Sequence, residues 1–376
     1  MASVILSGHG SSLLVTLSRP SALNALTHEM LTLLSAVTRA PPAASVIIRG
    51  AGGRAFCAGG DVRAVAALRG DARAQLAFFV DEYKLDWSLA RHAHTVSPHV
   101  ALWDGITMGG GIGISAHAPF RVATERTMWA MPETAIGFLP DVGGSFFLPR
   151  LAPARSGLAT YLAVTGARLV GADAVHVGVA THFVPSGRVD ALLTDLAQLP
   201  APPAPYAELH TRVGAVLARH ATPVDALPSF SLGRAEDAAF IARVFGAADS
   251  DAHNIFARLS AESGVLADAA KAALANASPT SVAITVEQLR RGAATGATLG
   301  GCLAMELRVV RALLGNEKSD FYEGVRAVLI DKGKGAPAAW TPPRISDVSA
   351  ASVRALFDGG GEVDGEAEIH ALGSHI

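Results

Sequence analysis

Two glycine-rich runs each follow a short apolar segment that is typical of a buried β-strand. Residues 46–49 (VIIR) precede the run at residues 56–61 (FCAGGD), and residues 100–103 (VALW) precede the run at residues 108–115 (MGGGIGIS). Because glycine has no Cβ, a ligand oxygen can approach the unpaired N–H groups where a strand ends or a helix begins. The pattern predicts an α/β fold with two backbone sites that together could hold one oxyanion.

A loop at residues 131–144 (MPETAIGFLPDVGG) carries two carboxylates, Glu133 and Asp141, on a backbone rich in glycine and proline. Pro140 lacks an N–H donor and disfavours helical angles in the residue before it. Apolar neighbours such as Phe138 would desolvate the acids and raise a carboxyl pKa toward the range useful for acid–base catalysis. We interpret the run as an active-site loop. A structural loop, in which Glu133 caps a backbone donor and Asp141 starts a helix, stays open at this point.

Residues 111–116 (GIGISA) also fit the loose fingerprint GxGxx(G/A) of a dinucleotide-binding site. That fingerprint requires an acidic residue about twenty positions later, and Glu125 is too close to serve. A nucleotide-binding fold also places its glycine motif near the start of the chain, whereas a hairpin-like pattern opens this one. The glycine run alone therefore does not predict a nicotinamide or flavin site.

Taken together, the three runs resemble the crotonase (enoyl-CoA hydratase/isomerase) superfamily, and within it they are most similar to the 3-hydroxyisobutyryl-CoA hydrolase family. The likeness extends over nearly the whole chain, through residues 81–83 (DEY), 120–125 (FRVATE), 278–281 (SPTS) and 323–332 (EGVRAVLIDK). The resemblance implies a crotonase-like β-β-α spiral core with a C-terminal helical region. It also implies hydrolysis of 3-hydroxyisobutyryl-CoA to 3-hydroxyisobutyrate and CoA in valine catabolism, and action on 3-hydroxypropionyl-CoA as a further substrate.

The resemblance also assigns site residues. Gly60 and Gly110 occupy the positions whose N–H groups form the oxyanion hole, and Gly110 also contacts substrate. Glu133 and Asp141 match the catalytic pair that touches the substrate, and Glu82 matches an acid that lines the same pocket. One acid of the pair would attack the thioester carbonyl, directly or through water, and the other would deliver a proton to the departing sulfur. We favour Glu133 as the attacking or activating group, and the reverse assignment stays open. No cofactor is implied, because CoA is part of the substrate.

One departure from the superfamily pattern separates hydrolase from hydratase. Hydratases carry a second glutamate two residues after the triple glycine, and this chain has Gly113 there. Hydration of a double bond is therefore the weaker alternative, and isomerisation, which uses an acid at the Asp141 position, stays open. A non-enzymatic alternative is a subunit associated with the mitochondrial ribosome. The net charge of −2 argues against it, since nucleic-acid partners favour basic surfaces.

Three histidines, His92, His94 and His99, fall in or beside a segment at residues 91–97 that is a few residues longer than the corresponding link in the hydrolase family. Metal sites combine such residues with carboxylates or cysteines at suitable spacing. We expect a solvated loop here and no metal.

Composition indicates a large core and a boundary near the proline-rich residues 201–205 (APPAP). The chain has 376 residues, of which 50% are hydrophobic. We predict three regions: a spiral core with the active site at residues 1–200, a mainly helical region covering the core at 201–345, and a largely disordered tail at 346–376. Periodicity predicts the following elements: strands near residues 3–6, 13–17, 45–49, 99–103 and 120–124, and helices near 236–246, 251–261, 281–291 and 300–314.

The sequence gives weaker indications of compartment and partners. We expect no membrane span and no clear transit peptide, since the first residues are already strand-like. The two cysteines, Cys57 and Cys302, suit a reducing compartment. The resemblance implies a mitochondrial location. A cytoplasmic or peroxisome-like location, the latter from the ending at residues 374–376 (SHI), is the alternative. The expected partners are an acyl-CoA and a second copy of the chain, not nucleic acid or membrane.

Overall fold

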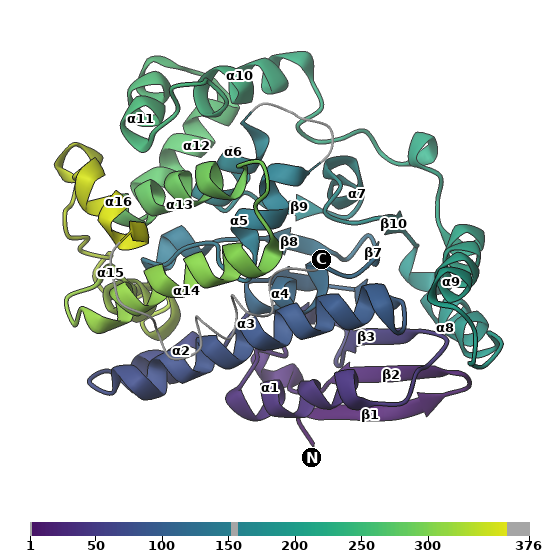
Figure 1. The fold of residues 1–376 in the computed structure, drawn as a ribbon. Coiled ribbons are helices and arrows are strands. Elements are labelled where there is room, and N and C mark those ends of the chain that lie inside the picture. The colour runs from purple at the N-terminus through teal and green to yellow at the C-terminus, as the bar shows by residue number, and fades with distance from the viewer. Residues whose placement is uncertain (1, 152–156, 359–376) are drawn as a thin grey trace. The chain divides into compact units, whose positions relative to one another are not determined.

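The computed structural model describes residues 2–151 and 157–358 (Figure 1). The chain divides into two compact units. Unit 1 comprises Met1–Gly60, Lys84–Trp129 and Arg168–Ser231, and unit 2 comprises Asp61–Tyr83, Ala130–Ala167 and Leu232–Ile376. Each unit is therefore assembled from segments that alternate along the chain. The consecutive domain boundaries drawn from the sequence at residues 200 and 345 stay a prediction.

The main sheet of unit 1 confirms the predicted strands. Its order is β1-β2-β3-β5-β7-β10, in which β1 and β2 form an antiparallel hairpin and the remaining neighbours are parallel. The strands are β1 (Val4–His9), β2 (Ser12–Leu17), β3 (Val46–Gly50), β5 (His99–Trp103), β7 (Phe120–Ala123) and β10 (His182–Phe183). The fully buried pattern of β5 suits a strand of a parallel sheet that is covered on both faces.

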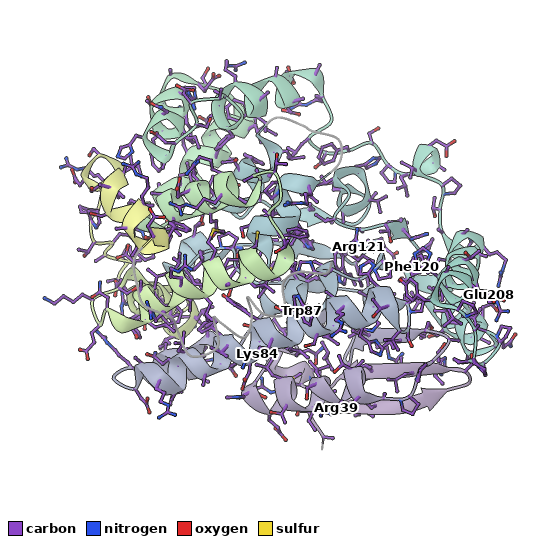
Figure 2. The ribbon with its side chains drawn as sticks, in the orientation of Figure 1. Arg39, Lys84, Trp87, Phe120, Arg121 and Glu208 are labelled. Atoms are coloured by element: carbon purple, nitrogen blue, oxygen red, sulfur yellow. The ribbon has the colours of Figure 1, made fainter. Side chains whose placement is uncertain are left out.

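Two antiparallel helices cover part of this sheet. Helices α8 (Val189–Ala197) and α9 (Tyr206–His220) each present apolar residues at helical spacing, such as Leu193 and Val213, to a core that also contains Ile47 of β3. Phe120 of β7, labelled in Figure 2, stacks on His210 of α9 with ring centroids 4.6 Å apart. The hydrophobic core of unit 1 therefore lies between the sheet and this helix pair (Figure 1).

A second, shorter sheet has the order β4-β6-β8-β9. Its strands are β4 (Ala55–Cys57), β6 (Ile106–Met108), β8 (Met128–Ala130) and β9 (Leu169–Val170). Strands β4 and β6 are parallel, so their carboxyl ends lie at the same edge of the sheet. The two glycine-rich runs begin at that edge.

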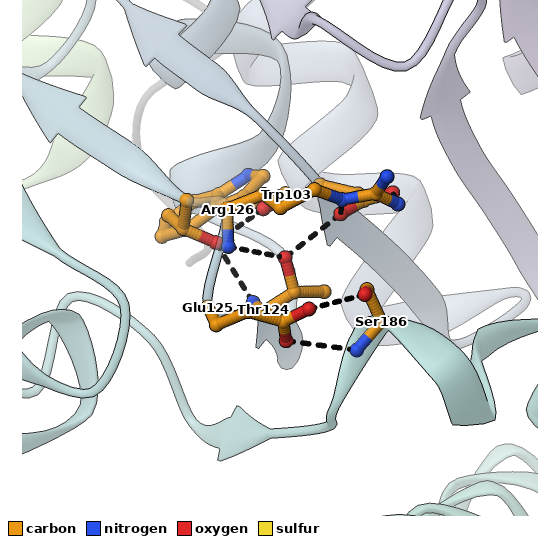
Figure 3. Close-up of polar contacts among 7 residues, drawn as sticks. Trp103, Thr124, Glu125, Arg126 and Ser186 are labelled. Carbon is orange, nitrogen blue, oxygen red and sulfur yellow. Dashed lines mark hydrogen bonds and ion pairs between the residues drawn. The ribbon is translucent and has the colours of Figure 1, made fainter. Parts of the chain in front are cut away.

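Polar contacts fasten the end of β7 to the segment before α8 (Figure 3). Ser186 donates its backbone N–H to Glu125 Oε2 at 2.9 Å, and its hydroxyl donates to Glu125 Oε1. Nearby, Thr124 Oγ1 donates to Asp104 Oδ1 at 2.8 Å, and Arg126 Nε donates to the same oxygen at 2.8 Å. Both oxygens of Glu125 thus accept hydrogen bonds from Ser186.

The expectation of a solvated histidine loop was wrong. Helix α3 (Ala72–Thr95) continues through most of the segment, and His92 and His99 are 6% and 1% exposed. Their rings share a hydrogen bond of 2.9 Å between His92 Nδ1 and His99 Nε2, and burial lowers the pKa of both. Two neutral imidazoles can form such a pair, since each ring has one donor and one acceptor. His94 is exposed, and its Nε2 bonds to His117 O at 2.8 Å.

Unit 2 is mainly helical and confirms the helices predicted beyond residue 232. Its elements are α2 (Val62–Ala67), the 3-10 turn η3 (Glu133–Ile136), α5 (Gly144–Phe147), α6 (Leu158–Thr165), α10 (Ala235–Phe245), α11 (Ala252–Ala261), α12 (Val265–Ala275), α13 (Pro279–Gly292), α14 (Leu299–Gly315), α15 (Asp320–Gly324) and α16 (Ala350–Asp358). Residues 72–83 of α3 also belong to this unit. Ser278 is the N-cap of α13, and its side chain accepts a hydrogen bond from Ser281 N at 3.1 Å.

Part of the predicted tail forms a helix. Helix α16 buries Val353 and Phe357, because apolar residues four apart lie on one helix face. Residues 359–376, where the sequence predicted disorder, lie outside the described residues. Over the described ranges, every helix is too short or too polar to span a membrane.

Candidate active site

The two glycine runs lie against each other in unit 1. Gly60 follows β4, and Gly110 is the first residue of α4 (Gly110–Ala116), directly after β6. A Cβ built on Gly59, which has a φ of 108°, would lie 3.6 Å from Gly109 Cα and 3.7 Å from Gly110 N. The first N–H groups of a helix have no partner within the helix. The predicted oxyanion residues thus come from neighbouring segments at one edge of a sheet.

Packing also requires glycine in this region. A Cβ on Gly111 would lie 2.6 Å from Cys57 O, so α4 packs against β4 too closely to leave room for a methyl group. Cys57 is buried, and its Sγ lies 3.6 Å from Gly59 O as a weak donor. Part of the glycine pattern therefore serves the fit of helix on strand, and this role does not by itself predict a ligand.

The three predicted acids gather in unit 2. Glu133 begins η3, Asp141 follows that turn, and Glu82 projects from α3. Their exposed fractions are 6%, 4% and 2%. The structure thus groups the acids with one another in unit 2 and the glycines with one another in unit 1.

Asp141 receives a hydrogen bond that the sequence did not predict. Tyr83 Oη donates to Asp141 Oδ2 at 2.7 Å, and the tyrosine is fully buried. Burial raises the pKa of Asp141 to about 7, although the hydrogen bond from Tyr83 lowers it. A carboxyl group with this pKa exchanges its proton near neutral pH, as a general acid or base must.

Glu133 and Glu82 are also held toward their protonated forms. Burial raises the pKa of each well above its ordinary value, and repulsion from Asp141 adds to the effect in both. Among the described residues, Glu82 Oε1 and Glu133 Oε2 are buried without a hydrogen-bond partner. Buried acceptors without partners are costly and are typical of groups that receive a ligand. The cluster could therefore hold a polar substrate group and transfer a proton to or from it.

The sequence did not predict two residues of this cluster, Tyr83 and Glu306. Glu306 is fully buried on α14 and accepts hydrogen bonds from the turn after Asp141. A sequence signal did exist, because Glu306 lies three residues after Leu303 and four before Val310, on the apolar stripe of its helix. A glutamate at such a position is rarely buried without a partner.

No group of three or more histidine, cysteine, aspartate or glutamate side chains in residues 2–151 and 157–358 is arranged to hold a metal ion. Within the carboxyl cluster, Tyr83 donates to Asp141, whereas one oxygen each of Glu82 and Glu133 has no partner among the described residues.

Comparisons with known proteins give consistent results over nearly the whole chain. A family model described as enoyl-CoA hydratase/isomerase matches residues 12–357. The chain is 42% identical to the mitochondrial 3-hydroxyisobutyryl-CoA hydrolase of Xenopus tropicalis, over 96% of this chain and 90% of that protein. It is 39% identical to the protein of that name from Homo sapiens, over 96% and 90% of the two chains.

Solved structures confirm the predicted crotonase-like fold. A carnitinyl-CoA dehydratase from Mycobacterium thermoresistibile matches with a TM-score of 0.81 and 34% identity, over 97% of this chain and 98% of that one. An enoyl-CoA hydratase from Rhodobacter sphaeroides matches with a TM-score of 0.79 and 34% identity, over 95% and 97%. The names of the curated relatives and of the solved structures describe different reactions on CoA thioesters.

Proposed function

The chain belongs to the enoyl-CoA hydratase/isomerase family, and from this premise we propose that it hydrolyses 3-hydroxyisobutyryl-CoA to 3-hydroxyisobutyrate and CoA, a step of valine catabolism. The observation that carries the proposal is the buried carboxyl cluster of Glu133, Asp141 and Glu82. Relatives named for this activity support it, since their identity of about 40% extends over most of the chain.

The glycine pair has the first role in this mechanism. The N–H groups of Gly60 and Gly110 bind the thioester oxygen as it gains negative charge. Removing one donor of such a pair costs roughly 10²–10³ in rate in comparable acyl-transfer sites.

The acids divide the remaining work. In its ionised form Glu133 attacks the carbonyl carbon or removes a proton from the attacking water, and the C–S bond breaks as Asp141 gives its proton to sulfur. A pKa of about 7 lets Asp141 hold that proton near neutral pH. Direct attack would leave a mixed anhydride that water then cleaves. Single turnover in H₂¹⁸O followed by mass analysis distinguishes the routes, because only direct attack places ¹⁸O in Glu133.

Glu82 provides the substrate preference. Its buried, unpartnered Oε1 is suited to accept a hydrogen bond from the 3-hydroxyl group of the acyl chain. A site built for a hydroxyl group rejects the analogue without it, since the protein acceptor is then left unpaired. Isobutyryl-CoA is therefore expected to be a poor substrate, and 3-hydroxypropionyl-CoA a second good one.

A hydratase or dehydratase is the second candidate, because the solved structures carry such names at 34% identity. Gly113 argues against it, since this position holds the second glutamate in the hydratase pattern. Hydration of crotonyl-CoA at a rate above thioester hydrolysis would favour this alternative.

The test is thiol release from a panel of acyl-CoA esters, with EDTA present because we propose no metal and no other cofactor. Wild type is expected to prefer 3-hydroxyisobutyryl-CoA over isobutyryl-CoA. Glu133→Gln and Asp141→Asn are expected to lose at least about 10²-fold in kcat with their folds retained. Equal turnover of the two esters would contradict the substrate, and full activity of both variants would contradict the mechanism.

The compartment and assembly belong to the same proposal. The relatives are named mitochondrial, which supports a mitochondrial location for this chain as well. Fractionation of cells that express the tagged protein distinguishes mitochondria from cytoplasm and peroxisomes. Self-association stays a prediction, and light scattering of the purified protein measures it.

A further inference from the structure

A buried carboxylate outside the proposed catalytic pair contacts the turn that carries Asp141. Gly143 N donates to Glu306 Oε2 at 2.8 Å. Ser145 donates twice to Glu306 Oε1, from its backbone N at 2.9 Å and from its Oγ at 2.6 Å. Both oxygens of Glu306 accept hydrogen bonds, so its side chain bridges the main-chain N–H groups of Gly143 and Ser145, shortly after Asp141.

That turn has an unfavourable backbone conformation. Val142 and Gly143 have φ angles of 53° and 81°, and Gly144 N donates to Asp141 O at 2.7 Å to close the turn. The left-handed region suits glycine, but a β-branched residue such as Val142 is a rare exception there. Such conformations persist when the surrounding structure fixes them. The contacts of Glu306 supply part of that constraint.

Helix α13 contacts the same turn through Gln288 and Gly292. Gln288 Nε2 donates to Pro140 O at 2.7 Å, directly before Asp141. Gly292 contacts the main chain closely, because a Cβ there would lie 1.9 Å from Ser145 O. The segment from Pro140 to Ser145 is therefore fixed by side chains and close packing from two helices, α13 and α14.

We propose that Glu306 is a positioning residue for the thioester hydrolysis proposed above. It holds the turn at residues 141–145 and thereby sets where the Asp141 carboxyl group points, without touching the substrate. The inference rests on the proposed function, since it assigns Asp141 the proton transfer that the turn orients. A displacement of about 1 Å in a catalytic group can cost on the order of 10²-fold in rate.

The first test is Glu306→Gln, which keeps the length of the side chain. Its amide NH₂ would face either Gly143 N or Ser145 N, so a donor meets a donor. The expected result is a fall in kcat of roughly 10- to 100-fold with KM within about threefold of wild type. Hydrogen exchange of the Gly143 and Ser145 amides is expected to be faster than in wild type.

Asp173→Asn is the matched control. Asp173 holds Ser231 in the same way, since it accepts from Ser231 N at 3.0 Å and from Ser231 Oγ at 2.6 Å. This variant is expected to lower the melting temperature and to leave kcat unchanged. An equal fall in kcat in both variants would overturn the proposal, because general loss of stability would then explain the effect.

The remaining outcomes also decide the question. A folded Glu306→Gln protein with kcat within about twofold of wild type would overturn the proposal. If Glu306→Gln fails to fold, Ser145→Ala serves as the second variant. It removes the hydroxyl donor to Glu306 and keeps the two backbone donors. We expect its kcat to fall roughly three- to tenfold. An unchanged kcat in Ser145→Ala would overturn the proposed role of Glu306. Wild type that cleaves none of the esters would refute the proposed function and this role with it, whereas the exchange measurement separately reports whether Glu306 holds the turn.

Discussion

At the scale of single residues, Tyr83 tunes the acid that it contacts. Its hydroxyl group stabilises ionised Asp141 and so lowers a pKa that burial raises to about 7. Tyr83→Phe removes that donor, so the pKa of Asp141 is expected to rise. A hydrogen bond to a charged group contributes about 1.5–3 kcal/mol, and 1.4 kcal/mol corresponds to one pH unit. The limb of the kcat–pH profile that reports Asp141 should therefore move to higher pH by roughly one pH unit.

Tyr322→Phe is the control for this profile. The Tyr322 hydroxyl is also buried in unit 2, but it donates to Gln75 Oε1 and Leu314 O, each at 3.0 Å. Its removal should cost stability and leave the limb in place. An unmoved limb in Tyr83→Phe would mean that Asp141 does not control the profile.

Residues of the cluster differed in how far the sequence could predict them. Glu133 and Asp141 lie in one short motif whose chemistry can be interpreted locally, whereas Glu82 was assigned through the family resemblance. Tyr83 and Glu306 act through contacts with segments 58 and 163 residues away in the chain, so local patterns do not reveal their partners, although the position of Glu306 on an apolar helix face indicates that it is buried. The oxyanion assignment of Gly60 and Gly110, and the catalytic role of each acid, stay predictions until activity is measured.

At the scale of elements, the approach of α13 to α5 depends on one glycine. A Cβ at Gly292 would lie 1.9 Å from Ser145 O, so Gly292→Ala must displace α5 or α13. Overpacking of this kind costs about 1–3 kcal/mol. We expect a lower melting temperature and a reduced kcat, because α5 follows the Asp141 turn directly. Gly315→Ala, at the open end of α14 with no heavy atom within 4 Å of a new Cβ, should be neutral or slightly stabilising. Equal stability of the two variants would contradict this account.

Long periodic elements were predictable and short ones were not. Helices α13 and α14 were found from apolar spacing, but η3 and α5 have only four residues each, which is too few for periodicity to show. The end of α3 was misjudged because histidines suggested solvent, whereas the pairing of His92 with His99 made their burial possible.

At the scale of the whole molecule, the interleaved units could not be read from composition. The proline-rich segment at residues 201–205 lies between helices α8 and α9 inside unit 1, and Leu232–Ile376 belongs to the same unit as Asp61–Tyr83. Contacts between such distant segments depend on side-chain packing that one sequence does not reveal. The buried acids of unit 2 have a consequence at this scale, because their protonation is linked to the stability of the fold.

The pKa of Asp141 rises from its ordinary value of 3.8 to about 7 in the folded protein, so the folded state binds more protons than the unfolded state between those values. Stability from this group is therefore complete below about pH 4 and is lost as the pH rises toward 7, by at most about 1.4 kcal/mol per pH unit. Asp141→Asn has no titrating group at this position. Its free energy of unfolding in urea should therefore increase relative to that of wild type as the pH rises from 4 to 7. The difference between the two proteins isolates Asp141 from the buried histidines, whose lowered pKa values act in the opposite direction. A difference that stays constant from pH 4 to pH 7 would show that Asp141 is ionised throughout, and the proton it is proposed to give to sulfur would then need another source.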